Sequence, residues 1–251
     1  MFLIHGFADS AYTWHRNLRV LMEAGFRVLA YDHPGCGESA LPAGFRFGVD
    51  ALTELAVGVL DALGIEQAHV IGSSMGGGIG LHLAVHHPRR LRHLVLVAPT
   101  CYHAPFRPFV FLFRWRPFSA ASRRLAGPWL VWPVLASQYG DTTRLTPAVL
   151  AQYRLAFQRP EYVHACAGLL RDYWNAAFYA TARHYREIAV PLHLIWGDRD
   201  VWVATGHYAP RLAADTGAGL TIIPHAGHMV HQVQPERFNE TVVRFLRGEG
   251  G

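Results

Sequence analysis

The segment Gly72-Ser73-Ser74-Met75-Gly76 constrains the fold of this chain more than any other stretch. It lies between an apolar run at residues 69–71 and a stretch rich in small residues that begins at Met75. This order predicts a strand, a sharp turn and a helix. In a G-x-S-x-G turn of this kind the serine hydroxyl projects above the sheet edge, and the glycines let neighbouring backbone pass close by. Ser74 is therefore a candidate nucleophile, but an ordinary Gly/Ser turn has the same pattern, so the context must decide.

Short apolar segments alternate with helical patterns on both sides of this turn. Strands are predicted at residues 2–4, 26–31, 69–71, 94–97, 192–196 and 220–223. Helices are predicted at residues 14–23, 49–63, 75–87, 205–214 and 235–246. Continuous apolar strands joined by helices indicate a parallel sheet that is covered on both faces. We therefore expect an α/β fold with a mostly parallel, doubly wound sheet.

The alternation is interrupted between residues 99 and 187, where we predict helices at 147–157 and 162–179 but no strand. We expect residues 1–98 and 188–251 to form the α/β core and residues 99–187 to form an inserted helical cap. Aromatic side chains are dense in this insertion, and they suit either an apolar substrate pocket or the core of the cap. They are Phe106, Phe109, Phe111, Phe113, Trp115, Phe118, Trp129 and Trp132.

Composition excludes several classes of protein. A chain of 251 residues with 51% hydrophobic and 16% charged residues fits one globular domain with an insertion. The net charge of +5 comes without a nucleic-acid-binding signature, so we expect no nucleic-acid partner. The cysteines Cys36, Cys101 and Cys166 are odd in number and far apart, which favours neither a disulfide framework nor a thiolate metal site. We expect a cytoplasmic protein that has no metal or other cofactor.

A serine nucleophile needs an imidazole to take its proton and a carboxylate to orient that imidazole. Two downstream segments follow predicted strands, where open α/β sheets place their ligands: residues 195–200 and 225–229. The first contains Asp198 and Asp200, and the second contains His228. The order serine, acid, histidine is the one that accompanies this turn motif.

Other polar residues near these segments have simpler interpretations. His225, His228 and His231 recur at three-residue spacing, but neither a fourth ligand nor an H-E-x-x-H pattern supports a zinc site. Asp32 lies in a turn with two glycines and a proline, so we interpret it as a structural carboxylate.

Five segments in order resemble the α/β-hydrolase fold enzymes, over nearly the whole chain outside the insertion. They are His5-Gly6-Phe7, residues 32–39, residues 72–77, residues 196–200 and Gly227-His228-Met229. The resemblance implies Asp200 rather than Asp198 as the acid and His228 as the base. It also implies that the backbone N–H groups of Phe7 and Met75 form an oxyanion hole. Relatives that cleave carbon–halogen bonds or epoxides use Asp at the turn, and Ser74 argues against both activities.

The resemblance further implies a serine esterase or lipase-like hydrolase for an apolar acyl or aromatic ester. Two alternatives stay open: the same triad could act on a carbon–carbon bond, a thioester or an amide, or the fold could bind a ligand with little turnover. Arg residues interleave with the aromatic residues of residues 106–124, which adds the hypothesis of weak peripheral lipid contact through the cap. The sequence predicts no particular oligomeric state.

The beginning of the chain departs from that family. Members usually have two strands, a hairpin of roughly 25 to 30 residues, before the strand that leads into the His-Gly turn. Only Met1 precedes the first predicted strand here. We therefore expect that N-terminal strands are missing, that the native product is longer, and that the strand at residues 26–31 forms an unprotected sheet edge.

Overall fold

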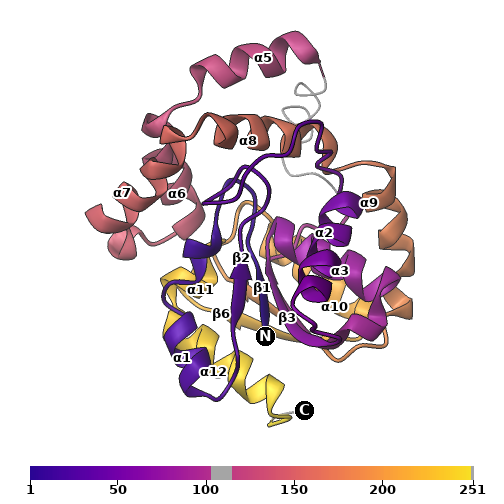
Figure 1. The fold of residues 1–251 in the computed structure, drawn as a ribbon. Coiled ribbons are helices and arrows are strands. Elements are labelled where there is room, and N and C mark those ends of the chain that lie inside the picture. Colours follow the sequence, from indigo (N-terminus) through magenta and orange to yellow (C-terminus); the bar gives the residue numbers. More distant parts are fainter. Residues whose placement is uncertain (103–114, 250–251) are drawn as a thin grey trace.

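The computed structural model describes residues 1–102 and 115–249, and its centre is one parallel sheet (Figure 1). The strand order is β2-β1-β3-β4-β5-β6, and every neighbouring pair is parallel. The strands are β1 (Phe2–Ile4), β2 (Leu29–Tyr31), β3 (Ala68–Ser73), β4 (Leu91–Val97), β5 (Leu192–Gly197) and β6 (Gly219–Ile223). All six predicted strands are therefore confirmed, and β2 is an edge strand as expected.

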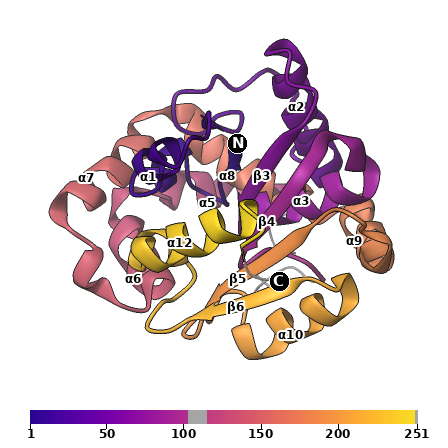
Figure 2. The ribbon, with the colours of Figure 1, turned by 90° about the horizontal axis from the view of Figure 1, so that it is seen from below.

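Helices cover both faces of the sheet, which explains why apolar side chains of the strands are buried on both sides. On one face lie α2 (Val49–Ala62), α3 (Met75–His86) and α10 (Thr205–Thr216), and the short η2 (Pro88–Arg90) follows α3. On the other face lie η1 (Ala11–Trp14), α1 (Leu18–Glu23), α11 (Val230–Val233) and α12 (Pro235–Leu246). Figure 2 shows α12 and α1 on the opposite side of the sheet from α3 and α10. The doubly wound arrangement is thus confirmed.

The described residues between β4 and β5 form helices and connecting turns but no strand. The helices are α5 (Arg116–Leu125), η3 (Pro128–Leu130), α6 (Val131–Tyr139), η4 (Thr142–Arg144), α7 (Pro147–Leu155), η5 (Ala156–Gln158), α8 (Pro160–Asp172), α9 (Ala176–Thr181) and η6 (Ala182–Glu187). In Figure 1, α5 to α8 lie beyond the carboxyl ends of the strands. By contrast, α9 packs beside α2 and α3, so the last part of this insertion belongs to the helical layer of the sheet.

Local side-chain chemistry explains where the helices differ from their predicted bounds. The helix predicted at 162–179 is two helices, because the Asn175 side chain accepts a hydrogen bond from Phe178 N at 3.0 Å and begins a new helix there. The helix predicted at 14–23 is likewise the short η1 followed by α1. Among the described residues, no helix combines the length and apolarity that a membrane span requires.

Candidate active site

Ser74 occupies a strained turn between β3 and α3. Its φ of 54° and ψ of −113° place a non-glycine residue at positive φ, directly before the first residue of α3. Ser74 N donates to Val97 O at 2.8 Å, and Ser74 O accepts from Gly78 N at 3.1 Å and from Thr100 N at 3.0 Å. These bonds from two neighbouring segments hold the strained backbone in place. The predicted strand, sharp turn and helix are confirmed.

The glycines of the motif are required by close backbone contacts. A Cβ added at Gly76 would collide with the carbonyl groups of Ile4 and His5, at the end of β1. A Cβ added at Gly72 would collide with the backbone of Gly76. The first turn of α3 therefore packs directly on the end of β1 and on the end of β3, and an ordinary Gly/Ser turn would not need this arrangement.

Asp200 and His228 form a buried pair. His228 Nδ1 lies 2.7 Å from Asp200 Oδ2, and the exposed fractions of the two side chains are 3% and 0%. Asp200 Oδ1 accepts from Trp202 N at 2.8 Å and from Val203 N at 3.0 Å, so both carboxylate oxygens have partners. Because Asp200 engages Nδ1, Nε2 is the ring nitrogen of His228 that is left to exchange a proton with another group.

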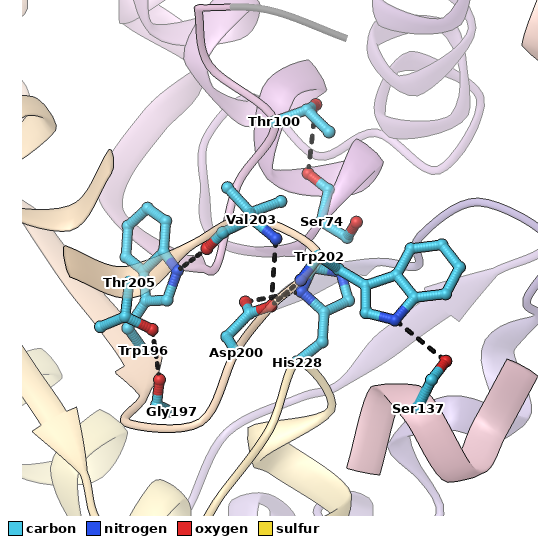
Figure 3. Close-up of polar contacts among 10 residues, drawn as sticks. All are labelled: Ser74, Thr100, Ser137, Trp196, Gly197, Asp200, Trp202, Val203, Thr205 and His228. Carbon is cyan, nitrogen blue, oxygen red and sulfur yellow. Dashed lines mark hydrogen bonds and ion pairs between the residues drawn. The ribbon is translucent and has the colours of Figure 1, made fainter. Parts of the chain in front are cut away.

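Neighbouring strands bring these residues to one edge of the sheet. Ser74 follows β3, Asp200 lies in the loop after β5, and His228 lies in the loop after β6. Figure 3 shows the three side chains in one close-up, with the Trp202 ring stacked near His228 at a centroid separation of 6.4 Å. The carboxyl ends of parallel strands thus gather a hydroxyl, an imidazole and a carboxylate, the groups that nucleophilic acyl transfer requires.

The loop after β1 lies against Ser74. A Cβ added at Gly6 would be 3.2 Å from Ser74 Cβ. The turn is held by His5, whose Nε2 accepts from His33 N at 3.0 Å and whose Nδ1 contacts Gly6 O at 2.8 Å. Burial lowers the pKa of His5 to about 4, so the ring is neutral at pH 7. A neutral ring has one nitrogen that accepts, here Nε2, and one that donates, here Nδ1.

Phe7 and Met75, the predicted oxyanion donors, belong to the two segments that meet at Ser74. Phe7 follows the turn after β1, and Met75 is the first residue of α3. The N–H groups in the first turn of a helix have no partner within the helix, so Met75 N–H is available to a ligand. Their role as oxyanion donors stays a prediction.

The other two carboxylates have structural contacts. Asp198 is exposed, and its Oδ1 accepts from Ala226 N at 3.2 Å. Asp32 accepts from Ala11 N at 2.6 Å and from Glu38 N at 2.9 Å. Asp32 is therefore a turn-forming residue, as interpreted from the sequence.

The three histidines at three-residue spacing have different partners. His225 is exposed and contacts Arg199 at 2.8 Å, whereas His231 is buried and its Nε2 contacts Thr13 Oγ1 at 2.8 Å. His228 contacts Asp200. Within residues 1–102 and 115–249, no group of three or more potential ligands could hold a metal ion.

The aromatic residues of the insertion were expected to line a substrate pocket or to form the core of the cap, and three of them do not form a core. Trp115, Trp129 and Trp132 have exposed fractions of 63%, 66% and 54%, so the interpretation as cap core is wrong for these three. Phe106, Phe109, Phe111 and Phe113 lie outside the described residues.

The cysteines are free thiols. Cys36 and Cys101 are buried, and burial raises the pKa of both thiols, that of Cys101 to about 12. Protonated, inaccessible thiols of this kind behave as small packing residues.

Comparisons with known proteins agree with this fold. A family profile described as alpha/beta hydrolase fold matches residues 1–235. The dihydrolipoyllysine-residue acetyltransferase component of the acetoin cleaving system of Pseudomonas putida is 30% identical over 98% of this chain, which spans only 62% of that protein. A 2-hydroxy-6-oxononadienedioate/2-hydroxy-6-oxononatrienedioate hydrolase of Pseudomonas sp is 27% identical over 97% of this chain and 86% of its own. The crystal structure of the enol-lactonase from Burkholderia xenovorans LB400 superposes with a TM-score of 0.77 and 26% identity, covering 98% of this chain and 90% of the other.

Proposed function

Because the chain belongs to the alpha/beta hydrolase fold family, we propose that it is a serine hydrolase that attacks a carbonyl carbon with Ser74. The observation that carries the proposal is the buried 2.7 Å contact between His228 Nδ1 and Asp200, which lies at the same sheet edge as the strained Ser74 turn. A buried carboxylate that fixes one nitrogen of an imidazole is the arrangement that turns a nearby serine into a nucleophile.

The mechanism assigns a role to each of these residues. His228 Nε2 takes the proton of Ser74 Oγ, and the oxygen attacks the substrate carbonyl. The N–H groups of Phe7 and Met75 stabilise the oxyanion, and each is worth about 3 kcal/mol of transition-state stabilisation. His228 then protonates the leaving group, which leaves an acyl group on Ser74. Water attacks that ester while His228 takes the proton of the water. His228 then returns this proton to Ser74 Oγ as the bond between Oγ and the acyl carbon breaks, and the free acid leaves.

The substrate we propose is a carboxylic ester with an apolar acyl or aromatic group, cleaved without a metal or other cofactor. Similarity to an enol-lactonase supports this choice, because a lactone is an ester. We propose the helices α5 to α8 as a cap that contacts the substrate, since they lie beyond the strand ends that carry Ser74 and His228. Residues 99–187 would then determine chain-length preference.

Hydrolysis of a carbon–carbon bond is the second candidate. The relative from Pseudomonas sp is named for a dienedioate with a 6-oxo group and no ester bond. A serine triad can also act on such a ketone, because the attack is still on a carbonyl carbon. A ligand-binding protein with little turnover is the candidate from another class.

One experiment separates the three. The protein is assayed with p-nitrophenyl esters of graded acyl length and, in parallel, with a 2-hydroxy-6-oxo-dienoate whose visible absorbance disappears on cleavage. Release of p-nitrophenol that is lost in Ser74→Ala supports the esterase, and loss of the dienoate colour alone supports the carbon–carbon hydrolase. If neither substrate reacts and a fluorophosphonate probe does not label Ser74, the enzymatic proposal is wrong and the binding protein is favoured.

The exposed tryptophans support a further property, weak peripheral contact with anionic lipid. Trp115, Trp129 and Trp132 are exposed on or beside α5 and α6. The sequence has no Asp or Glu between Glu66 and Asp141 but has eight Arg residues between positions 89 and 124. Tryptophan prefers the interface of a bilayer, and Arg is attracted to anionic headgroups.

A further inference from the structure

The end of helix α6 contacts the loop that carries His228. Three successive backbone N–H groups donate to α6: Gly227 N to Tyr139 O at 2.9 Å, His228 N to Gln138 O at 2.6 Å, and Met229 N to the same Gln138 O at 3.2 Å. The last carbonyl groups of a helix have no partner within the helix. Here those carbonyl groups bind the histidine loop, so the insertion fixes the backbone of His228 itself.

Two glycines allow this close approach. A Cβ added at Gly227 would collide with Gln138 O and with the backbone of Tyr139. Gly140 ends α6 with a φ of +68°, and a Cβ there would lie 3.1 Å from Gly227 Cα. Backbone packs on backbone at this point, so a side chain on either glycine would separate α6 from the histidine loop.

A buried side-chain network locks the same junction. Tyr139 Oη donates to Gln232 Oε1. Gln232 Nε2 donates to Thr13 Oγ1 at 2.7 Å and lies 2.7 Å from Tyr153 Oη, to which it also donates. Thr13 Oγ1 also lies within hydrogen-bond distance of His231 Nε2, at 2.8 Å, and burial lowers the pKa of His231 to about 3, so that its ring stays neutral. The network runs from α6 through α11, which directly follows His228, to η1 of the core.

The same helix also contacts the loop of the acid. The exposed Ser137 accepts from Trp202 Nε1 at 3.1 Å (Figure 3). Trp202 N in turn donates to Asp200 Oδ1 at 2.8 Å. Helix α6 therefore touches both loops that supply the Asp200–His228 pair.

We infer that the C-terminal turn of α6 is a positioning element for His228 and that Tyr139 and Gln232 are its positioning residues. The inference rests on the proposed function, in which His228 Nε2 must meet Ser74 Oγ in a narrow range of geometry. The histidine loop obtains three of its backbone hydrogen bonds from the insertion, not from the sheet. The insertion is thus part of the proton-transfer apparatus as well as a cover.

The test compares Tyr139→Phe with Tyr185→Phe. Tyr139→Phe removes the donor to Gln232 and keeps the ring. Tyr185 is also a buried tyrosine of the insertion, but its hydroxyl donates to Cys101 O at 2.7 Å, away from both loops. The first readout is the downfield proton resonance of the His228–Asp200 hydrogen bond, assigned by its loss in His228→Ala. The second is steady-state hydrolysis of the best ester.

We expect Tyr139→Phe to shift or broaden the downfield resonance and to lower kcat about tenfold with little change in KM, because misplaced catalytic groups slow the chemical step. Tyr185→Phe should change neither readout. Ser137→Ala changes an exposed position and should lower kcat about threefold at an unchanged melting temperature. This second variant keeps the test decisive if Tyr139→Phe does not fold. If both α6 variants match Tyr185→Phe in both readouts, the inference is wrong. A resonance that responds to Tyr139→Phe in a protein without turnover would support the positioning contact and refute the proposed activity.

Discussion

Asp200→Asn tests the proposed acid, and the structure predicts its effect in detail. Asp200 Oδ1 accepts from Trp202 N at 2.8 Å and from Val203 N at 3.0 Å, and an Asn at this position keeps those bonds only if its amide oxygen occupies the Oδ1 site. The amide NH2 must then face His228 Nδ1, where Asp200 Oδ2 lies at 2.7 Å in the native chain. That NH2 is a donor, so Nδ1 must accept and the ring proton moves to Nε2. In this tautomer His228 cannot take the proton of Ser74.

A tautomer error of this kind lowers kcat by about 10⁴-fold, which corresponds to about 5 kcal/mol of transition-state stabilisation. The assay is steady-state hydrolysis of the best p-nitrophenyl ester, with melting temperature as the measure of folding. Asp198→Asn is the matched control, because the exposed Asp198 side chain accepts a hydrogen bond from Ala226 N through Oδ1, which the amide oxygen of Asn can keep; it should hold activity within about threefold. A loss below tenfold in Asp200→Asn, or an equal loss in Asp198→Asn, would refute the assignment of Asp200.

Three further predictions concern stability and surface contact. Gly76→Ala should lower the free energy of unfolding in urea by about 3 kcal/mol, because its Cβ would collide with backbone carbonyl groups. The control is Gly58→Ala in α2, where an added Cβ has no neighbour within 4 Å, and it should raise that free energy by up to about 1 kcal/mol. Equal effects of the two variants would contradict the close packing at Gly76. Burial raises the pKa of Asp9 from 3.8 to about 6, so the folded state holds a proton that the unfolded state has lost, and this term lowers stability as pH rises from about 4 to 6. We therefore expect the effect of Asp9→Asn on the free energy of unfolding to be more stabilising at pH 8 than at pH 4, by roughly 2 to 3 kcal/mol. The same effect at both pH values would refute the raised pKa of Asp9. Vesicles with anionic lipid should pellet part of the protein at low salt, and replacing Trp129 and Trp132 by Ser should abolish this; equal pelleting by neutral vesicles would argue against the lipid contact.

Local pattern was sufficient for much of this fold. Helix α12 begins at Pro235 and ends at Leu246 as predicted, and α2 ends just before Gly64, whose φ is +64°. The apolar runs became the six strands because a sheet covered on both faces needs continuous apolar segments. The turn at Ser74 could also be predicted, because close backbone contacts require its glycines and these glycines appear in the sequence.

Residue type and position at strand ends also placed two candidate segments at the same edge of the sheet. The choice of Asp200 over Asp198 came from resemblance to a family, and only the structure supplied a physical ground for it, the buried 2.7 Å contact with His228. Asn175 could begin a helix or extend a loop, and its capping bond to Phe178 became evident only in three dimensions.

The sequence by itself therefore determined the sheet, the order of the segments and the nucleophile turn, because each depends on the periodicity or the backbone requirements of a few adjacent residues. The tertiary structure alone decided how the insertion meets the site. Tyr139 and Gln232 are separated by 93 positions, yet their buried side chains bond to each other, and Gln138 holds the backbone of His228. Carbonyl groups at a helix end carry no sequence signal, so nothing in the local pattern marks residues 131–139 as part of the site until packing brings α6 to His228.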